Sequence, residues 1–382
     1  NVIALEIQCG RRYLRQSPCA FERWRANEVW GRQKVKSDRL TQAVKLSPQS
    51  MADLCGSWIY DGPAADRLWQ KSAIGSPAGQ GKLELSPVET LFVHYHRHLE
   101  LPTNDWMKNS LIENSLLLQE YSILEALRVP GNKVVLSKNI GLISQQIHPK
   151  SWAARWTSNT HPRNSKPVSE VRWFHESEKL DSTELYQWTI DVINSGRIPE
   201  VLVVDGELSV VTYHLSSENP VGSLQNNRDL ESLTNLSGGI KSADGMLFPA
   251  KGWNIQQIGV PTSEGMHIDS ITCEIVQGLN PLSEGATILS DLLKRGLVIR
   301  PGFKYGTRWR CYDKPLGEDH APFLVILPED APKDWAGACL ASRLASGVNK
   351  IWLHPVSQGD SWNYLAIKRP PADSRWSNPN KR

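Results

Sequence analysis

The chain has 382 residues, a net charge of +3, and 40% hydrophobic and 22% charged residues. This length is too great for one ordinary core and fits two or three domains, and the composition is that of a soluble globular protein. No apolar run approaches the ~18 residues needed to cross a bilayer, and the start of the sequence lacks the basic leader and long apolar stretch of a signal peptide. We therefore expect no membrane partner.

The six cysteines are scattered, at positions 9, 19, 55, 273, 311 and 339. They form no Cys-x-x-Cys pair, and no histidine stands at zinc-finger spacing from them. His94 and His98 are four residues apart in "HYHRH", but no glutamate accompanies them as in a metal-binding helix, so a solvated helix face is expected. The sequence predicts no metal, no cofactor, no disulfide framework and a cytoplasmic location.

Residues 1–50 form a basic segment with ten Lys/Arg against four Asp/Glu, interleaved with Trp24 and Trp30. Clustered cations with aromatic residues suit a polyanion such as RNA. A solvated basic extension explains the same pattern equally well, and both interpretations stay open.

Hydrophobic periodicity predicts helices and strands that alternate along the rest of the chain. Residues 216–245 are poor in large apolar groups and rich in Ser, Asn and Gly, so they read as a connection between two halves. The predicted helices are 110–127, 182–195, 286–295 and 332–346. The predicted strands are 133–136, 200–204, 208–213, 323–327, 351–354 and 363–367.

The two halves look alike at low resolution. "STELYQWTIDVINSGRIPEVLVVDGELSVVTYHL" and "DWAGACLASRLASGVNKIWLHPVSQGDSWNYLAI" both run helix, Ser-Gly, strand, polar turn, strand. We predict a duplicated unit of about 160 residues. Chance alternation of helices and strands is the alternative explanation.

Three polar residues of the second half are candidates for chemistry. Tyr312 ends a strand-like segment, His320 precedes the next strand, and Lys350 opens the strand after the last predicted helix. Three strand ends on one rim of a sheet can converge. A lone tyrosine at a strand end and a histidine after a turn are, however, usually structural.

These residue types suit metal-free cleavage of RNA by its own 2′-hydroxyl. That reaction needs a base at the hydroxyl, an acid at the departing 5′-oxygen and positive charge near the phosphorane. Histidine can be the acid and lysine can hold the charge. Tyrosine is a poor base unless nearby cations favour its phenolate, and Lys350, Arg308 and Arg310 could supply that field.

The stretch 286–312, "ATILSDLLKRGLVIRPGFKYGTRWRCY", with "EDHAPFLVILPE" and "ASRLASGVNKIWL" after it, resembles the catalytic unit of the tRNA-intron splicing endonucleases. The family pattern is a helix ending LRxRG, then vkxGxkfGxDFxvY, a histidine before a strand, and RxAxxVxK after a helix. Here Gly302 to Gly306 match the glycine-bounded core, and Arg308 replaces the common aspartate. The last motif is matched by Arg343, Ala345, Val348 and Lys350.

The resemblance is strong over 283–382 and weaker over 51–215. It implies that Tyr312 is the general base, His320 the general acid, and Lys350 the cation that stabilises the transition state. The products would carry a 2′,3′-cyclic phosphate and a 5′-hydroxyl.

The resemblance also implies that an arginine and a tryptophan hold a splice-site base between them. Arg343 matches that arginine, and Trp362 and Trp376 are both candidates for the tryptophan. Arg308 is a further predicted RNA contact. In the family, an acidic loop of the non-catalytic unit docks on the partner's catalytic unit. Asp205 and Glu207 stand at that position, although an ordinary Asp-Gly hairpin turn would have the same sequence.

The first half lacks a Tyr-then-His pair at the right interval, so we expect it to be catalytically empty. Aligning the Ser-Gly pairs of the two halves places Glu200 or a neighbour in "GRIPE" at the position of Lys350, and Val192 at that of Arg343. In two-repeat members of the family, such a repeat supports a catalytic one, and two chains pair.

We therefore predict an α+β fold of tandem duplicated tRNA-endonuclease-like units. Each would have a small N-terminal α/β subdomain and a mixed-sheet C-terminal subdomain flanked by helices. The expected function is excision of introns from precursor tRNA at bulge-helix-bulge motifs by an archaeal-type homodimer. The alternatives are the catalytic subunit of a heterotetramer and a non-catalytic RNA-binding scaffold. The predicted parts are the basic segment 1–50, a pseudo-catalytic repeat 51–215, an N-terminal subdomain 216–282 and a catalytic domain 283–382.

Overall fold

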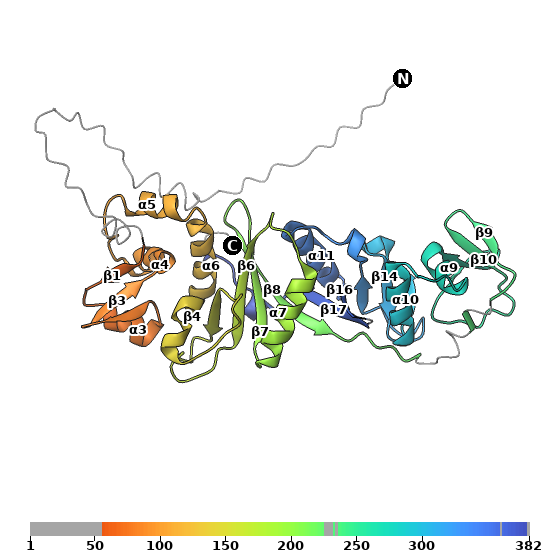
Figure 1. The fold of residues 1–382 in the computed structure, drawn as a ribbon, viewed down its shortest axis with the longest axis horizontal. Helices are drawn as coiled ribbons and strands as arrows, with labels where there is room; N and C mark the ends of the chain where they lie inside the picture. The colour runs from red at the N-terminus through yellow and green to blue at the C-terminus, as the bar shows by residue number, and fades with distance from the viewer. Residues whose placement is uncertain (1–55, 225–231, 234–235, 360, 380–382) are drawn as a thin grey trace, which may run out of the picture.

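The structure is a computed structural model that describes residues 56–224, 232–233, 236–359 and 361–379. The basic segment 1–50 lies outside the described residues. The described part is an elongated α+β molecule with one ten-stranded sheet at its centre. A smaller sheet lies toward each end of the long axis (Figure 1).

The large sheet has the strand order β13-β14-β15-β16-β17-β8-β7-β6-β5-β4. From either edge inward, the pairings run antiparallel, antiparallel, parallel, antiparallel, and the central strands β17 and β8 pair antiparallel. We refer to β4–β8 and their helices as the first half, and to β13–β17 and theirs as the second half. The strands are Lys133–Leu136 (β4), Ala153–Trp156 (β5), Ser169–His175 (β6), Ile198–Val204 (β7), Val210–Glu218 (β8), Val298–Pro301 (β13), Trp309–Tyr312 (β14), Phe323–Val325 (β15), Ile351–Gln358 (β16) and Ser361–Lys368 (β17).

One face of the large sheet is covered by the helices that connect its parallel strands, since such strands need a crossover. These helices are α7 (Ser182–Asn194) and α11 (Trp335–Gly347). Each begins at an aspartate whose side chain accepts a backbone N–H: Asp181 from Glu184, and Asp334 from Gly337. Both helices contribute to one apolar core with residues of both halves of the sheet.

The opposite face is covered by α6 (Leu117–Arg128) in the first half and by α10 (Glu284–Lys294) in the second. Two separate apolar cores lie beneath them. The large sheet is therefore buried on both faces, which explains its near-continuous apolar strands.

A small subdomain precedes each half of the large sheet in the sequence. The first contains a three-stranded sheet of order β1-β3-β2, and the second a four-stranded sheet of order β11-β12-β10-β9. The first consists of Trp58–Tyr60 (β1), Ala65–Ser72 (α3), Ser76–Gly79 (β2), Lys82–Leu85 (β3), Pro87–Arg97 (α4) and Trp106–Glu113 (α5). The second consists of Ile240–Ser242 (β9), Gly245–Phe248 (β10), Val260–Pro261 (β11), Met266–Asp269 (β12) and Ser270–Val276 (α9).

Most predicted elements of the large sheet and its crossovers are confirmed, with ends shifted by a few residues. The predicted single helix 110–127 is wrong, because the chain forms α5 and α6 with a break at Asn114. The backbone there is extended, and the Asn114 side chain accepts the N–H of Leu116 and donates to Glu120. The predicted connection 216–245 is shorter than expected, because β8 continues to Glu218 and β9 begins at Ile240.

His94 and His98 do not share a helix face. Helix α4 ends at Arg97, and His98 has a left-handed backbone with φ 57°. The His94 Nδ1 atom lies 2.7 Å from the carbonyl oxygen of Leu99. Within the described ranges, no three His, Cys, Asp or Glu residues are grouped to hold a metal ion. None of the described helices combines the length and apolarity needed to cross a membrane.

Candidate active site

Tyr312 and Lys350 lie level with each other on the two sides of β15. Cys311, the residue before Tyr312, pairs with Phe323 in the antiparallel β14–β15 ladder. Ile351, the residue after Lys350, pairs with the same phenylalanine in the parallel β15–β16 ladder. Both polar residues therefore stand at the end of the sheet where β15 begins.

His320 lies three residues before β15, at the same end of the sheet, and its side chain is exposed. Its backbone N–H donates to the Asp319 carboxylate at 2.8 Å, and that carboxylate is 3.0 Å from the Lys314 ammonium. The Lys350 ammonium donates to the carbonyl oxygen of Ala321, the residue after His320. The three predicted residues are thus gathered round the start of one strand.

Two arginines surround Tyr312. The Arg310 guanidinium carbon lies 5.8 Å from the Tyr312 ring centre, and Arg300 pairs with Arg310 across the β13–β14 ladder. Burial lowers the pKa of Arg300 to about 10, still well above neutral pH. Arg308, predicted to contribute to the same field, instead pairs with Asp269 of the second small subdomain at 2.6 Å. The sequence analysis did not identify Arg300. The signal that could have identified it is an arginine near the end of an otherwise apolar strand.

Tyr305 contacts the candidate catalytic lysine, because the Lys350 ammonium lies 5.5 Å from the centre of its ring. The tyrosine ends a 3₁₀ turn, Phe303–Tyr305, that two glycines make possible. Gly306 has φ 66°, and a Cβ on Gly302 would come within 2.5 Å of the Thr307 hydroxyl oxygen. The glycine-bounded core of the sequence motif is therefore a turn that places an aromatic ring beside Lys350.

Arg343 lies on one face of the large sheet, and both candidate tryptophans lie on the opposite face. Arg343 is exposed on α11. Trp362 packs on the core beneath α10, and Trp376 packs on the core beneath α6. A single chain thus places neither tryptophan on the arginine's face.

Trp376 is engaged with the first half of the sheet. Its indole N–H donates to the Glu200 carboxylate, the Arg155 guanidinium carbon lies 4.9 Å from its ring centre, and its backbone bonds with Thr212. Burial raises the pKa of Glu200, but hydrogen bonds and the positive charge of Arg155 outweigh burial and lower the pKa to about 2. The C-terminal segment is thereby anchored to a buried charge.

Asp205 and Glu207 lie in the turn between β7 and β8. The Asp205 side chain accepts the backbone N–H groups of Glu207 and Ser209 at 2.9 and 2.7 Å, so it shapes the turn. The Glu207 side chain is exposed at the tip. Asp205, one of the two predicted contact residues, therefore stabilises the turn in which it lies.

The strand ladders show which residue of the first half occupies the place of Lys350. Ile198 pairs with the first residue of β6, as Ile351 pairs with the first residue of β15. The residue before Ile198 is Arg197. The prediction was Glu200 or a neighbour in "GRIPE", and the structure selects Arg197 from that stretch. The residue is not Glu200 itself because the Ser-Gly pair follows α7 but forms the end of α11. The ladder alignment also matches Trp156 with Tyr312 and Lys166 with His320. It matches Ile190 with Arg343, so the predicted match of Val192 is wrong.

Arg197 is neutralised and covered. Its guanidinium donates to the Glu170 carboxylate at 2.6 Å and to the carbonyl oxygen of Gln146 at 2.7 Å, and its side chain is 12% exposed. The carbonyl belongs to the connection between Ser137 and Trp152, which is nine residues longer than the matching connection between Gly302 and Arg308. The place that Lys350 holds in the second half is therefore filled by an internal ion pair.

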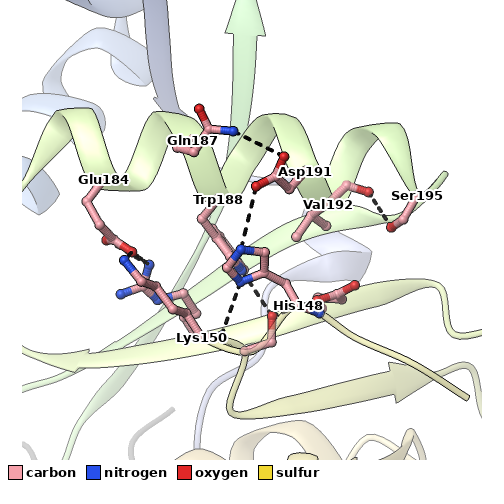
Figure 2. Close-up of polar contacts among 11 residues, drawn as sticks. His148, Lys150, Glu184, Gln187, Trp188, Asp191, Val192 and Ser195 are labelled. Atoms are coloured by element: carbon pink, nitrogen blue, oxygen red, sulfur yellow. Dashed lines mark hydrogen bonds and ion pairs between the residues drawn. The ribbon is translucent and has the colours of Figure 1, made fainter.

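This longer connection is fastened to α7 by an imidazole–carboxylate contact and an ion pair. The imidazole Nε2 atom of His148 lies 3.6 Å from Asp191, and the Lys150 ammonium lies 2.7 Å from Glu184. Figure 2 shows both basic side chains lying against the helix. The longer connection is thus held against α7 of the first half.

Comparison with known proteins agrees with this geometry. Residues 285–364 match the family model "tRNA intron endonuclease, catalytic C-terminal domain". A tRNA-splicing endonuclease of Thermoplasma volcanium is 30% identical over 29% of this chain and 38% of the relative. One of Methanosarcina mazei is 22% identical over 80% of this chain and 94% of the relative, and one of Methanopyrus kandleri is 29% identical over 25% of this chain and 54% of the relative.

The second half, with its strand-end cluster of tyrosine, histidine and lysine, is therefore a catalytic domain of the tRNA intron endonuclease type. Two tRNA-splicing endonucleases, of Methanosarcina mazei and Methanosarcina acetivorans, align with 80% of the chain at 22% identity, so the similarity extends beyond this domain.

Proposed function

We propose that the chain is a tRNA splicing endonuclease that excises introns from precursor tRNA at bulge-helix-bulge motifs. The single observation that supports this most is the gathering of Tyr312, His320 and Lys350 at the start of β15, inside the matched catalytic domain. The reaction would give 2′,3′-cyclic phosphate and 5′-hydroxyl ends, without a metal.

In this proposal Tyr312 takes the proton of the attacking 2′-hydroxyl. The Arg310 guanidinium lies beside its ring, and Arg300 pairs with Arg310 across the neighbouring strand. His320, exposed to solvent and substrate, gives a proton to the departing 5′-oxygen. Lys350, held by the Ala321 carbonyl and the Tyr305 ring, stabilises the charge of the phosphorane.

We further propose that the two halves arose by duplication and that the first is pseudo-catalytic. The mirrored strand order and pairing types support the duplication. The replacement of the three candidate residues by Trp156, Lys166 and Arg197, with Arg197 already paired, supports the loss of function. The division at residues 51–215, 216–282 and 283–382 stays part of this proposal.

The test is cleavage of a bulge-helix-bulge RNA by the purified chain in EDTA, with analysis of the product ends. We expect cyclic phosphate and 5′-hydroxyl ends from the wild type and loss of cleavage in His320→Ala. The matched control is Lys166→Ala, which changes the corresponding exposed residue of the first half and should cleave normally. Cleavage that survives His320→Ala would contradict the assignment of the acid.

We propose a homodimer as the working unit, with the tip of the β7–β8 turn on the partner's catalytic domain. Sedimentation of the wild type and of Glu207→Ala tests this, and the variant is expected to dissociate at higher protein concentration than the wild type. A chain that sediments as a monomer and binds RNA without cutting it would favour the heterotetramer subunit or the scaffold instead. Residues Arg343, Trp362, Trp376 and Arg308 remain predicted RNA contacts, with any tryptophan contact to the Arg343 face coming from a second chain.

A further inference from the structure

Phe303 is the most exposed large hydrophobic residue of the described chain, with 90% of its surface open to solvent. It stands on the 3₁₀ turn Phe303–Tyr305, which is closed by backbone bonds from Tyr305 to Gly302 and from Gly306 to Phe303. Among the described aromatic residues of the second half, the others are buried or half-buried. A large aromatic ring held this openly on a closed turn indicates a contact surface rather than a packing residue.

The turn connects this ring to the candidate active site. A 3₁₀ helix has three residues per turn, so residues two apart point in different directions. Tyr305 points inward, where it packs on the core shared by α7 and α11 and contacts Lys350. Phe303 points outward from the same turn, and its exposed neighbour is the cation Lys304.

The first half shows that the fold does not require this ring. Ser137 bonds to Trp152 as Gly302 bonds to Arg308, so Lys138 occupies the place of Phe303. The half in which the three candidate catalytic residues are replaced therefore also lacks the exposed aromatic. The exposed ring therefore occurs in the half that carries the candidate catalytic residues, and the other half forms the same fold without it.

We infer that Phe303 is a stacking platform for an unpaired nucleobase of the RNA, next to the phosphate that is cleaved. This rests on the proposed function. An RNA base fits better than an apolar protein partner, because the ring is flanked by Lys304 and stands two residues from the contact with Lys350. Every base has a π face, so stacking tolerates sequence while fixing the position of a splayed nucleotide.

The test uses the full chain and a bulge-helix-bulge RNA with a 2′-deoxy group at the cleaved nucleotide and 2-aminopurine in the bulge. We expect Phe303→Ala to weaken binding roughly tenfold, within the range of one lost base stack, and to relieve the quenching of 2-aminopurine. Phe303→Trp should restore both signals. Leu279→Ala, which shortens another exposed apolar side chain, is the matched control and should change neither.

Unchanged affinity and quenching in Phe303→Ala would overturn the inference. Altered sedimentation of that variant with unchanged RNA affinity would also overturn it and would identify a second copy of the chain as the partner. Cleavage of the unmodified RNA by the wild type is measured alongside. If the wild type does not cleave this RNA, the proposed function is wrong. If it cleaves and Phe303→Ala behaves like the wild type, only the inference about Phe303 is wrong.

Discussion

The two halves of the large sheet hold a cation at the same backbone position and treat it in opposite ways. In the second half, Lys350 contacts a carbonyl oxygen and an aromatic ring, and neither contact cancels its charge. In the first half, Arg197 lies against the buried carboxylate of Glu170 and beneath the carbonyl of Gln146. The same place in one fold is thus an available positive charge in one half and a closed ion pair in the other.

Under the proposed duplication, the first half would have lost its site by neutralisation of the cation as well as by replacement of residues. The residue of β15 that matches Glu170 is Leu324, so the second half has no carboxylate there to compete with a phosphate. The position of Lys350 is consequently free to act on a substrate, whereas that of Arg197 contributes to the stability of the fold.

The largest expected effect comes from exchanging these two cations for alanine. Lys350→Ala should lower the single-turnover cleavage rate about a hundred- to a thousand-fold, because it removes a preorganised charge near the phosphorane. Arg197→Ala should leave the rate of the folded protein unchanged. Equal losses in both variants would show that the first half takes part in the reaction.

The opposite ranking is expected for stability. Arg197→Ala leaves the Glu170 carboxylate, 2% exposed, without its cation, and should cost about 3–5 kcal/mol in the free energy of unfolding. Lys350 has no buried carboxylate as its partner in the described structure, so Lys350→Ala should cost much less. Urea denaturation monitored by tryptophan fluorescence measures both, and similar values for the two variants would contradict this view of the ion pair.

A pH effect should also separate the halves, because β16 buries His354 where β7 has Val201. Burial lowers the pKa of His354 to about 4, so the folded state holds it neutral. Between pH ~6.5 and 4 the unfolded chain takes up a proton that the folded chain refuses, and stability falls with falling pH by up to about 3 kcal/mol. His354→Val should flatten the stability curve in that window.

Glu200→Gln provides the control for this measurement. The pKa of Glu200 is lowered to about 2, so its contribution is present above its unfolded pKa and is lost as the pH falls through the folded one. The variant should therefore change the acid dependence below pH ~4, where His354→Val should not. The comparison is confined to that range because the His214 imidazole lies 3.7 Å from the same carboxylate, and the same acid dependence in both variants would contradict these assignments.

The smallest expected effect concerns the C-terminal anchor. Trp376→Ala removes a half-buried ring from the Arg155 guanidinium and the Glu200 carboxylate, and should cost about 2 kcal/mol of stability. RNA affinity per folded monomer should be unchanged if this ring serves its own chain. A large loss of affinity without loss of stability would instead assign Trp376 to RNA stacking.

Sequence alone predicted the elements that carry strong local signals. Apolar runs located the strands, and caps such as Asp181 and Asp334 start the crossover helices, because capping and periodicity act over a few residues. The order and interval of Tyr312, His320 and Lys350 also placed the candidate site, since each stands at the end of a predictable strand.

What the sequence could not decide depends on contacts between distant segments. The ladder partners of Ile198 and Ile351 identified Arg197 as the counterpart of Lys350, where aligning the Ser-Gly pairs had named Glu200 or a neighbour in "GRIPE". Strand parity and packing, likewise, put Trp376 on the face opposite Arg343. Pairing register and side-chain facing arise from the whole sheet, and a shift of one residue exchanges its two faces. The sequence by itself therefore determined which residues could do the chemistry, and the tertiary structure decided which charges are free to do it.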